Sequence, residues 1–340
     1  AALQYSTSEG YPPLRAWIAQ HMTKLGVSCR PDNVLVTNGS QQALEFLGKL
    51  FVSPGETILT DTPTYLGALQ AFSATEPTYD ACLGEGSNAT AEACRSRAAA
   101  SGGRVAMAYL VPDFANPTGI TLSAAARSQH LQLARELGVP LIEDSAYAAL
   151  RYDGAPLPPI AALDVAASGG IDSSCVIYCG TFSKVISPGL RVGWVVASET
   201  IIERLVLIKQ AADLNSSLIN QMVVHRLAER SFEDCAAAAR RTYRARRDAM
   251  LAALDAQLAG RATWSRPEGG LFVWLTLEES RDASALLKIA IEQQGVAFVP
   301  GTGFHPQGGG GNTLRLSFSQ NPPERIADGI RRLAAALDVS

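Results

Sequence analysis

Short runs of apolar residues recur along the first two thirds of the chain, separated by segments whose apolar positions repeat at helical spacing. The runs predict strands at 34–37, 57–59, 105–111, 139–144, 175–179 and 192–197. After the first run, Ala43, Leu47 and Leu50 share one face of a predicted helix. Another helix is predicted at about 123–138. Strands that alternate with helices favour a mainly parallel sheet covered on both faces, so we expect an α/β fold.

The last third of the chain has a different order of elements. Residues from about 199 to 258 are predicted to be mostly helical, with one long helix over 231–258. Strands are then predicted at 271–276, 296–299 and 313–318, with helices at 283–293 and at the end of the chain. This order indicates a smaller α+β domain. We therefore expect a large domain over 1–240 and a small C-terminal domain over 241–340.

Composition excludes several classes of protein. The chain has 340 residues, is 47% hydrophobic and carries a net charge of −3, so neither nucleic acid nor an anionic membrane is expected as a partner. No apolar stretch is long enough to span a membrane. Six scattered cysteines lack zinc-ligand spacing and favour a reducing cytoplasm. Because the chain begins with Ala1 rather than Met, it is expected to start inside a longer gene product.

Lys184 is the most informative candidate residue. It lies in GTFSKVISPGLRVGW, at 180–194, directly after a predicted buried strand. In parallel α/β sheets ligands bind in the loops after the carboxyl ends of strands. A lysine placed there among small hydroxyl residues indicates an amine that forms a Schiff base with a carbonyl group.

A second group of residues indicates an anion site. Asn38-Gly39-Ser40-Gln41 joins a strand to a helix, where free backbone N–H groups and the helix dipole favour a phosphate. Thr181, Ser183 and Arg191 supply two hydroxyls and a guanidinium for the same anion. Each residue also has a structural alternative when it is considered alone. Ser40 could simply cap its helix, and Arg191 could pair with a surface carboxylate.

Two carboxylates end the strand at 139–144. Alternation places Glu143 and Asp144 on opposite faces. Either one could pair with a protonated pyridine nitrogen, and the spacing does not choose between them. The structural alternative is that Asp144 caps the next helix.

Four further side chains are functional candidates, and all but Tyr147 also have a structural interpretation. Asn116 follows a strand in an Asn-Pro turn and offers an amide to a phenolate oxygen. Tyr147 could donate to the same oxygen, and Tyr65 could stack on a flat cofactor or simply pack. Arg315 points away from the apolar face of its strand and suits either a substrate carboxylate or a surface ion pair.

Taken together, these motifs resemble the fold-type I pyridoxal 5′-phosphate (PLP) enzymes, in particular the class I/II aminotransferases. The resemblance rests on NGSQQAL, PTY, NPTG, EDSAY, TFSK, PGLRVGW and LRLSF, which occur in this order over nearly the whole chain. The segments LQYSTSEGYPPLRAW, NGSQQALEFLGKLF and PTYLGALQAFSA are similar to the branch that acts on 2-aminoadipate, branched-chain and aromatic amino acids. The catalytic-like domain of MocR-type regulators is similar as well. The resemblance implies a three-layer PLP-transferase fold.

The resemblance also implies roles for individual residues. Lys184 would hold PLP as a Schiff base and move the proton between Cα and C4′, and Asp144, rather than Glu143, would keep the pyridine nitrogen protonated. Tyr65 would stack on the ring, while Asn116 and Tyr147 would bind its oxygen. Arg315, together with Asn116, would bind the substrate. The phosphate would be bound by Ser40, Gln41, Thr181, Ser183 and Arg191, and by Tyr5 from the partner subunit.

From this resemblance we expect an enzyme that transfers the amino group of an L-amino acid to a 2-oxo acid such as 2-oxoglutarate. A homodimer with shared active sites is expected, because Tyr5 would act across the interface. Two alternatives stay open at this point. One is a different PLP-dependent reaction on amino acids, either a lyase or a decarboxylase. The other is the effector domain of a MocR-type regulator.

Overall fold

A seven-stranded sheet forms the centre of the larger part of the computed structural model, which describes residues 3–339. The strand order is β1-β7-β6-β5-β4-β2-β3. Neighbouring strands from β6 to β3 run parallel, whereas β7 is antiparallel to both β1 and β6. The bounds are Val34–Thr37 for β1, Thr57–Leu59 for β2, Thr78–Asp80 for β3, Val105–Leu110 for β4, Leu141–Asp144 for β5, Val176–Thr181 for β6 and Gly193–Val196 for β7.

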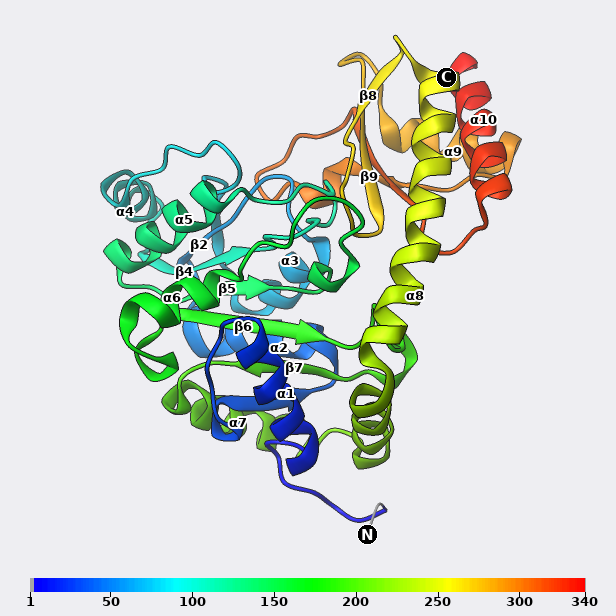
Figure 1. Cartoon of the computed structure of the whole chain (residues 1–340). Helices are drawn as coiled ribbons and strands as arrows, with labels where there is room; N and C mark the ends of the chain where they lie inside the picture. Colours follow the sequence, from blue (N-terminus) through cyan, green and yellow to red (C-terminus); the bar gives the residue numbers. More distant parts are fainter. Residues whose placement is uncertain (1–2, 340) are drawn as a thin grey trace.

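Helices cover both faces of this sheet and give three layers (Figure 1). One face packs against α2 (Gly39–Phe51), α3 (Leu66–Phe72) and α7 (Glu199–Ala212). The opposite face packs against α1 (Pro12–Lys24), α4 (Ala91–Ala100), α5 (Ala124–Leu137) and α6 (Ile160–Ser168). The central strands are buried on both sides, which explains why they are continuous apolar runs rather than alternating ones. The expected mainly parallel, three-layer α/β fold is confirmed.

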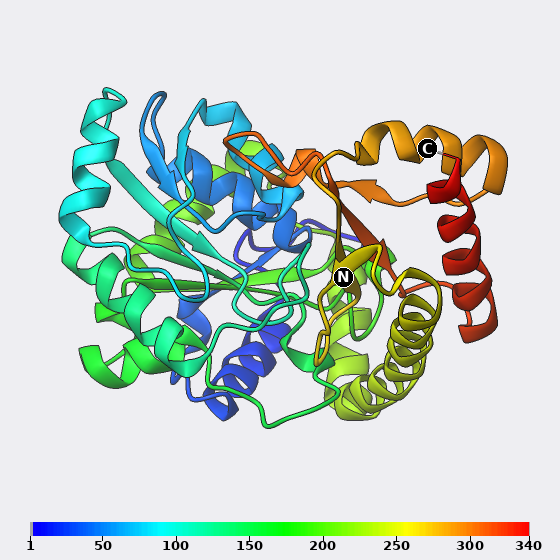
Figure 2. The ribbon, with the colours of Figure 1, turned by 90° about the horizontal axis from the view of Figure 1, so that it is seen from above.

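A smaller sheet lies to one side of the first (Figure 2). It is antiparallel, in the order β10-β11-β9-β8, and α9 (Ala283–Gln294) and α10 (Pro323–Asp338) pack with it around one apolar core. The strands are β8 (Ala262–Trp264), β9 (Phe272–Leu277), β10 (Val299–Pro300) and β11 (Thr313–Ser317). The long helix α8 (Leu218–Leu258) runs from the large sheet to α10 (Figure 1).

Two predicted elements differ from the structure for local reasons. The long helix predicted at 231–258 begins earlier, but Ser231 has a non-helical backbone (φ −148°, ψ 16°), so the predicted start coincides with a kink inside α8. The strand predicted at 296–299 is observed later in the chain, as β10. Val296 instead donates its N–H to Ala290 C=O and completes the end of α9 beyond the left-handed Gly295.

None of the helices within residues 3–339 combines the length and the apolar character that crossing a membrane requires. The turns that follow β4, β5 and β6 open at the same edge of the large sheet, since these three strands run parallel. Residues from the beginning of α2 lie at this edge as well. The fold therefore brings four separate chain segments to one place.

Candidate active site

A cavity of about 240 Å³ lies at this edge of the large sheet. Most of its walls are polar side chains, and all but two of its lining residues are candidates from the sequence. The cavity is lined by Ser40, Gln41, Tyr65, Val111, Asn116, Asp144, Ala146, Tyr147, Thr181, Ser183, Lys184 and Arg191. The structure thus brings together residues that are up to about 150 positions apart, as expected for a site built from the loops after parallel strands.

Lys184 lies in the turn after β6. The turn is anchored by Phe182, which is fully buried against Trp194 and accepts a backbone hydrogen bond from Val185 (3.3 Å). The Lys184 Nζ lies 6.0 Å from the centre of the Tyr147 ring. Burial and the nearby Arg191 lower the pKa of Lys184, because both disfavour the ammonium form, and Asp144 opposes them only in part. A larger fraction of the amine is therefore neutral and able to attack a carbonyl carbon.

Arg191 and the start of α2 form a cationic corner of the cavity. The Arg191 guanidinium lies 3.4 Å from Ser183 Oγ and 3.5 Å from Asn38 O. A Cβ at Gly39 would overlap this guanidinium, and one at Gly193 would lie 2.6 Å from the Ser40 nitrogen. Both positions therefore need glycine for β7, Arg191 and the helix N-terminus to approach one another. The N-terminus of α2, hydroxyl groups and a guanidinium converge here, as phosphate binding requires.

Behind this corner, a buried ion pair fixes the start of α2. Lys209 on α7 binds Asp213 (2.7 Å), and Asp213 accepts hydrogen bonds from Asn38 (2.8 Å) and Gln42 (2.9 Å). The Lys209 side chain is completely buried, so removing Asp213 would leave an unpaired buried charge. The sequence did not reveal this network, because its members come from two helices that are distant in the chain.

The two acids that end β5 face different environments. Glu143 accepts hydrogen bonds from the N–H groups of Ile160 (2.9 Å) and Ala161 (2.8 Å), and so binds the start of α6. Asp144 lines the cavity instead. The residue that binds a helix N-terminus is thus Glu143 and not Asp144. Burial raises the pKa of Asp144 to about 6 and that of Glu143 to about 7.

One Asp144 oxygen provides a test of whether a pyridine nitrogen fits here. The hydroxyl of Tyr109 on β4 donates to Asp144 Oδ2 (2.9 Å), whereas Oδ1 is buried and has no hydrogen-bond partner in the described structure. A buried carboxylate oxygen without a donor is costly. A protonated pyridine nitrogen in the cavity would supply both the missing donor and a positive charge, so the residues fit PLP.

The sequence did not identify Tyr109 as a site residue, because it lies within an apolar run that predicts a buried strand. The only available signal was that a buried tyrosine hydroxyl needs a partner.

The contact of Tyr109 with Asp144 leads to a prediction. Because the Tyr109 hydrogen bond lowers the pKa of Asp144, Tyr109→Phe should raise that pKa and shift the acid limb of the kcat–pH profile to higher pH. We also expect kcat to fall more than about ten-fold, since a hydrogen bond to a charged group contributes about 1.5–3 kcal/mol.

The matched control is Tyr79→Phe. Tyr79 is a half-buried tyrosine whose hydroxyl only reaches a backbone oxygen (Leu69, 3.5 Å). Kinetics and the pH profile should be unchanged in this variant. An acid limb in Tyr109→Phe that coincides with that of the unsubstituted enzyme would show that the hydroxyl does not tune Asp144.

Arg315 lies on β11 next to the cavity. Its guanidinium donates to Asn116 Oδ1 (2.8 Å) and lies 4.3 Å from the centre of the Phe272 ring and 5.2 Å from that of Phe304. No carboxylate of residues 3–339 is within ion-pair distance, and Nε has no hydrogen-bond partner there. Burial lowers the pKa of Arg315. A half-buried guanidinium without a counter-ion suits a ligand carboxylate better than the surface ion pair considered from the sequence.

The remaining candidates divide into two groups. The Tyr65 hydroxyl lies 3.4 Å from Gln41 Oε1, and Tyr147 is buried close enough to Asn116 to form a hydrogen bond. Tyr147 therefore lies beside Asn116, with which it was grouped, and Tyr65 lies beside Gln41 in the wall of the cavity. Tyr5, in contrast, is 83% exposed and does not line the cavity of its own chain.

The chain is similar to known proteins over nearly its whole length. The model of the family described as aminotransferase class I and II matches residues 1–333. A 2-aminoadipate transaminase from Thermus thermophilus is 42% identical over 99% of this chain and 82% of its own length. Aromatic-amino-acid aminotransferase 1 from Thermococcus litoralis is 38% identical over 99% of this chain and 80% of its own length.

A solved structure gives the same result in three dimensions. The crystal structure of LysN, an α-aminoadipate aminotransferase from Thermus thermophilus complexed with N-(5′-phosphopyridoxyl)-L-leucine, superimposes with a TM-score of 0.90. It is 42% identical in sequence, and the match covers 100% of this chain and 84% of that chain. The likeness therefore includes both sheets and every segment that lines the cavity.

Proposed function

This chain belongs to the class I and II aminotransferases, and from that membership we propose that it acts on L-amino acids of the 2-aminoadipate, branched-chain or aromatic type, with 2-oxoglutarate as the acceptor. The relatives named for 2-aminoadipate and aromatic amino acids, and the leucine adduct bound to LysN, support this substrate range. The observation that carries the proposal is that the Lys184 amine and the unpartnered Asp144 oxygen line one cavity, next to the Arg315 guanidinium, which has no carboxylate partner within residues 3–339.

PLP is the cofactor of this family, and when bound it supplies an electron-withdrawing ring that stabilises negative charge at the substrate Cα. We propose that Asp144 binds the ring nitrogen, that Asn116 and Tyr147 bind the ring oxygen, and that Tyr65 covers one ring face. The phosphate would be held by Ser40, Gln41, Thr181, Ser183 and Arg191, with the partner subunit's Tyr5. The cationic corner of the cavity matches the negatively charged phosphate of PLP. The acidic end of the cavity, at Asp144, matches the protonated ring nitrogen.

In this proposal Lys184 is the base of the reaction. Its Nζ accepts the proton from the substrate Cα and later returns a proton, which requires the amine to be neutral. Burial and Arg191 favour this neutral form, as described above. Asp144 stays ionised once a cationic N–H partner is present, because an opposite charge within hydrogen-bonding distance lowers a carboxyl pKa.

Arg315 would bind the substrate α-carboxylate and thereby orient the Cα–H bond towards Lys184. Arg315→Lys keeps the positive charge, but lysine cannot bind a carboxylate in the bidentate geometry of a guanidinium. We expect kcat/KM to fall about 30-fold for every amino acid, a loss of about 2 kcal/mol, since hydrogen bonds to charged groups contribute about 1.5–3 kcal/mol.

The control for this variant is Arg325→Lys, at an exposed arginine of α10, which should leave kcat/KM unchanged. The α-carboxylate is common to all substrates, so the loss should be uniform. A loss confined to one class of side chain would contradict the assignment of Arg315 to the α-carboxylate.

We further propose a homodimer in which Tyr5 reaches the site of the partner subunit. Support comes from an apolar surface on the first turns of α8, where Ile219, Met222, Val223 and Leu227 are 38–45% exposed. An exposed cluster of large apolar side chains is typical of an interface between proteins. We also propose that the large and small domains, at 1–240 and 241–340, divide inside α8.

The dimer can be tested by light scattering. The native protein should be a dimer, whereas Met222→Glu, which places a charge on the apolar surface, should be largely monomeric. Ile291→Glu is the matched control, because Ile291 is 50% exposed on α9, outside this surface, and its variant should stay dimeric. Tyr5→Phe should stay dimeric but bind PLP more weakly. A native monomer that binds PLP fully would contradict the role given to Tyr5.

The proposed activity is tested by mixing the purified, PLP-loaded protein with a panel of L-amino acids, with and without 2-oxoglutarate. Formation of a 2-oxo acid that depends on the acceptor, together with glutamate in equal amount, supports transamination. Turnover without any acceptor would instead favour a lyase or decarboxylase. The amino acid with the highest kcat/KM identifies the preferred side-chain type.

A further inference from the structure

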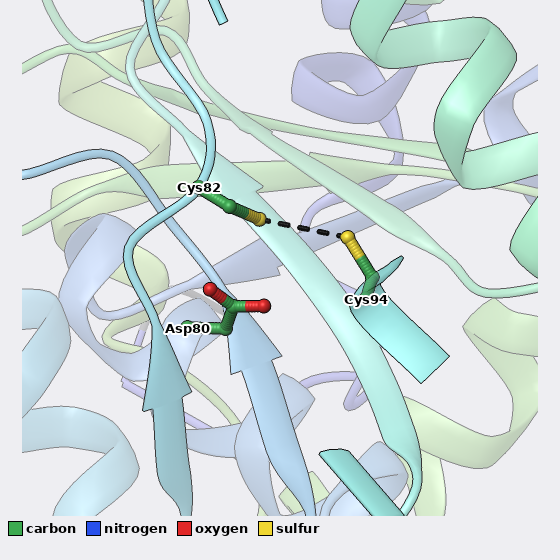
Figure 3. A group of neighbouring side chains, drawn as sticks. All are labelled: Asp80, Cys82 and Cys94. Atoms are coloured by element: carbon green, nitrogen blue, oxygen red, sulfur yellow. Dashed lines mark hydrogen bonds between the residues drawn. The ribbon is translucent and has the colours of Figure 1, made fainter. Parts of the chain in front are cut away.

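A pair of thiols lies at the far edge of the large sheet. Cys82 follows β3, the edge strand, and Cys94 is on α4, which packs next to it (Figure 3). Their sulfur atoms are 3.7 Å apart, and Figure 3 shows the two side chains pointing towards each other. Both cysteines are free, and no other two cysteine sulfurs within residues 3–339 are in hydrogen-bonding contact. Neither belongs to the proposed active site.

The surroundings make the two thiols unequal. Cys94 is completely buried, whereas Cys82 is partly exposed. Arg97, one turn along α4, donates to Asp80 (2.8 Å) and to the Cys94 sulfur (3.5 Å). Burial and the nearby Asp80 raise the pKa of Cys82, and burial raises the pKa of Cys94, while Arg97 opposes both shifts in part. Cys82 is thus the thiol that a reagent in solution can reach, and Cys94 is the thiol whose anion has a hydrogen-bond donor.

Asp80, Cys82 and Cys94 could also be considered as metal ligands, since one donor atom from each lies within 4.8 Å of the others. The position of Arg97 argues against a cation. Its guanidinium already neutralises Asp80 and contacts Cys94, so a divalent ion would have to expel it and also ionise two thiols of raised pKa. The cluster also offers three donors rather than the four of a closed structural zinc site. A bond between the sulfurs leaves Arg97 in place, and each thiol has to ionise only transiently, as it attacks.

We propose that Cys82 and Cys94 form a reversible disulfide, with a low-molecular-weight disulfide such as oxidised glutathione as the oxidant. In the first step the Cys82 thiolate attacks the glutathione disulfide, forms a mixed disulfide and releases one glutathione thiolate. In the second step the Cys94 thiolate attacks the Cys82 sulfur and releases the second glutathione. The two cysteines lose two electrons and two protons, and one glutathione disulfide is reduced to two thiols.

The disulfide would cross-link the edge of the sheet to a helix. It would close a loop from Cys82 to Cys94 and link the end of β3 to α4. The same chain segment is already tied to Thr60, which donates its N–H to Asp80 O and accepts from Leu83 N–H (both 3.0 Å). Thr60 directly follows β2 and precedes the segment that leads to Tyr65. Because the cross-link restricts the unfolded chain, the oxidised protein should have a higher Tm than the reduced protein.

The test uses the PLP-loaded native enzyme, incubated with oxidised glutathione and mapped by mass spectrometry without reduction. We expect a peptide pair linked through Cys82 and Cys94, a Tm raised by several degrees, and reversal of both by dithiothreitol. In Cys94→Ser the mixed disulfide on Cys82 should persist, because no thiol can displace the glutathione. Cys82→Ser removes the reactive position without placing a hydroxyl in the buried site, and it should give neither product. Cys235→Ser, at a half-buried cysteine of α8, should behave like the native enzyme.

Several results would overturn the proposal. One is a mixed disulfide on Cys82 that persists in the native enzyme, since Cys94 would then not be placed to displace glutathione. Another is oxidation of the remaining four cysteines with Cys82 and Cys94 left reduced. A third is tight binding of Zn²⁺ that is lost in Cys82→Ser, combined with no cross-link, which would assign the cluster to a metal instead.

Discussion

Replacing Lys184 with alanine is expected to abolish turnover and leave the fold intact. The lysine is the one candidate base beside the cavity with a lowered pKa, and proton transfer by a positioned base contributes up to about 10⁴-fold in rate. We therefore expect kcat to fall by as much as ~10⁴-fold. The structure records no ion pair to Lys184 within residues 3–339, and the nearby Arg191 and Arg315 repel its charged form. Its removal should thus leave the Tm unchanged or slightly higher.

Two measurements distinguish this role from a merely structural one. Borohydride treatment of the native enzyme should leave the cofactor attached to the peptide that contains Lys184, and the Lys184→Ala variant should bind PLP only without covalent attachment. Lys288→Ala is the matched control, at an exposed lysine of α9, and should retain full kcat. Ordinary activity in Lys184→Ala would remove the basis of the proposed mechanism.

The sequence predicted the central strands well because they are buried on both faces. Such strands consist of consecutive apolar residues. The strand predicted at 105–111 overlaps the observed β4, and the strand predicted at 175–179 overlaps the observed β6. The edge strand β3, at Thr78–Asp80, has three residues that are mostly half-buried and polar. It has no comparable pattern, since its position depends on pairing with β2 and not on its own apolar content.

The candidate residues were predictable for a related reason. Lys184 and Asn116 follow predicted strands, and the parallel sheet then brings them to one edge. Side chains that act through other side chains were not predictable in this way. Phe272 and Phe304, which flank Arg315, come from separate parts of the C-terminal region, and only the packed structure shows that they lie around one guanidinium.

The choice between the two acids of β5 shows the limit most clearly. Alternation puts Glu143 and Asp144 on opposite faces but does not say which face holds the cavity. The structure distinguishes them because Glu143 binds the start of α6, which lies 17 residues further along the chain. That contact depends on how α6 crosses the sheet, and local sequence carries no information about it.

Asp144→Asn is the second substitution with a large expected effect, and its two consequences have opposite signs. The variant keeps the size of the side chain but loses the charge that would pair with a protonated ring nitrogen. Losing one partner of a buried charge pair costs about 3–5 kcal/mol, so we expect kcat to fall about 10³-fold. Stability of the enzyme without PLP should increase instead, because Asp144 is buried and one of its oxygens has no hydrogen-bond partner there.

The stability effect should depend on pH in a defined direction. The pKa of Asp144 is raised from 3.8 to about 6 in the folded protein, so folding is opposed by ionisation of this carboxyl group. The penalty is absent below pH 3.8, grows as the pH rises towards 6, and is complete above that, where it reaches about 3 kcal/mol. The Tm gain of Asp144→Asn without PLP should therefore be largest above pH 6 and vanish in acid.

Glu143→Gln is the control, because it makes the same chemical change one residue away. Glu143 accepts two backbone N–H groups at the start of α6, and the amide group of glutamine can replace only one of these contacts. This variant should keep kcat within a few-fold, because Glu143 binds the start of α6 and does not line the cavity. Assays of kcat with PLP therefore separate the two acids. If Asp144→Asn kept kcat while Glu143→Gln lost it, the assignment of Asp144 to the cofactor would be wrong.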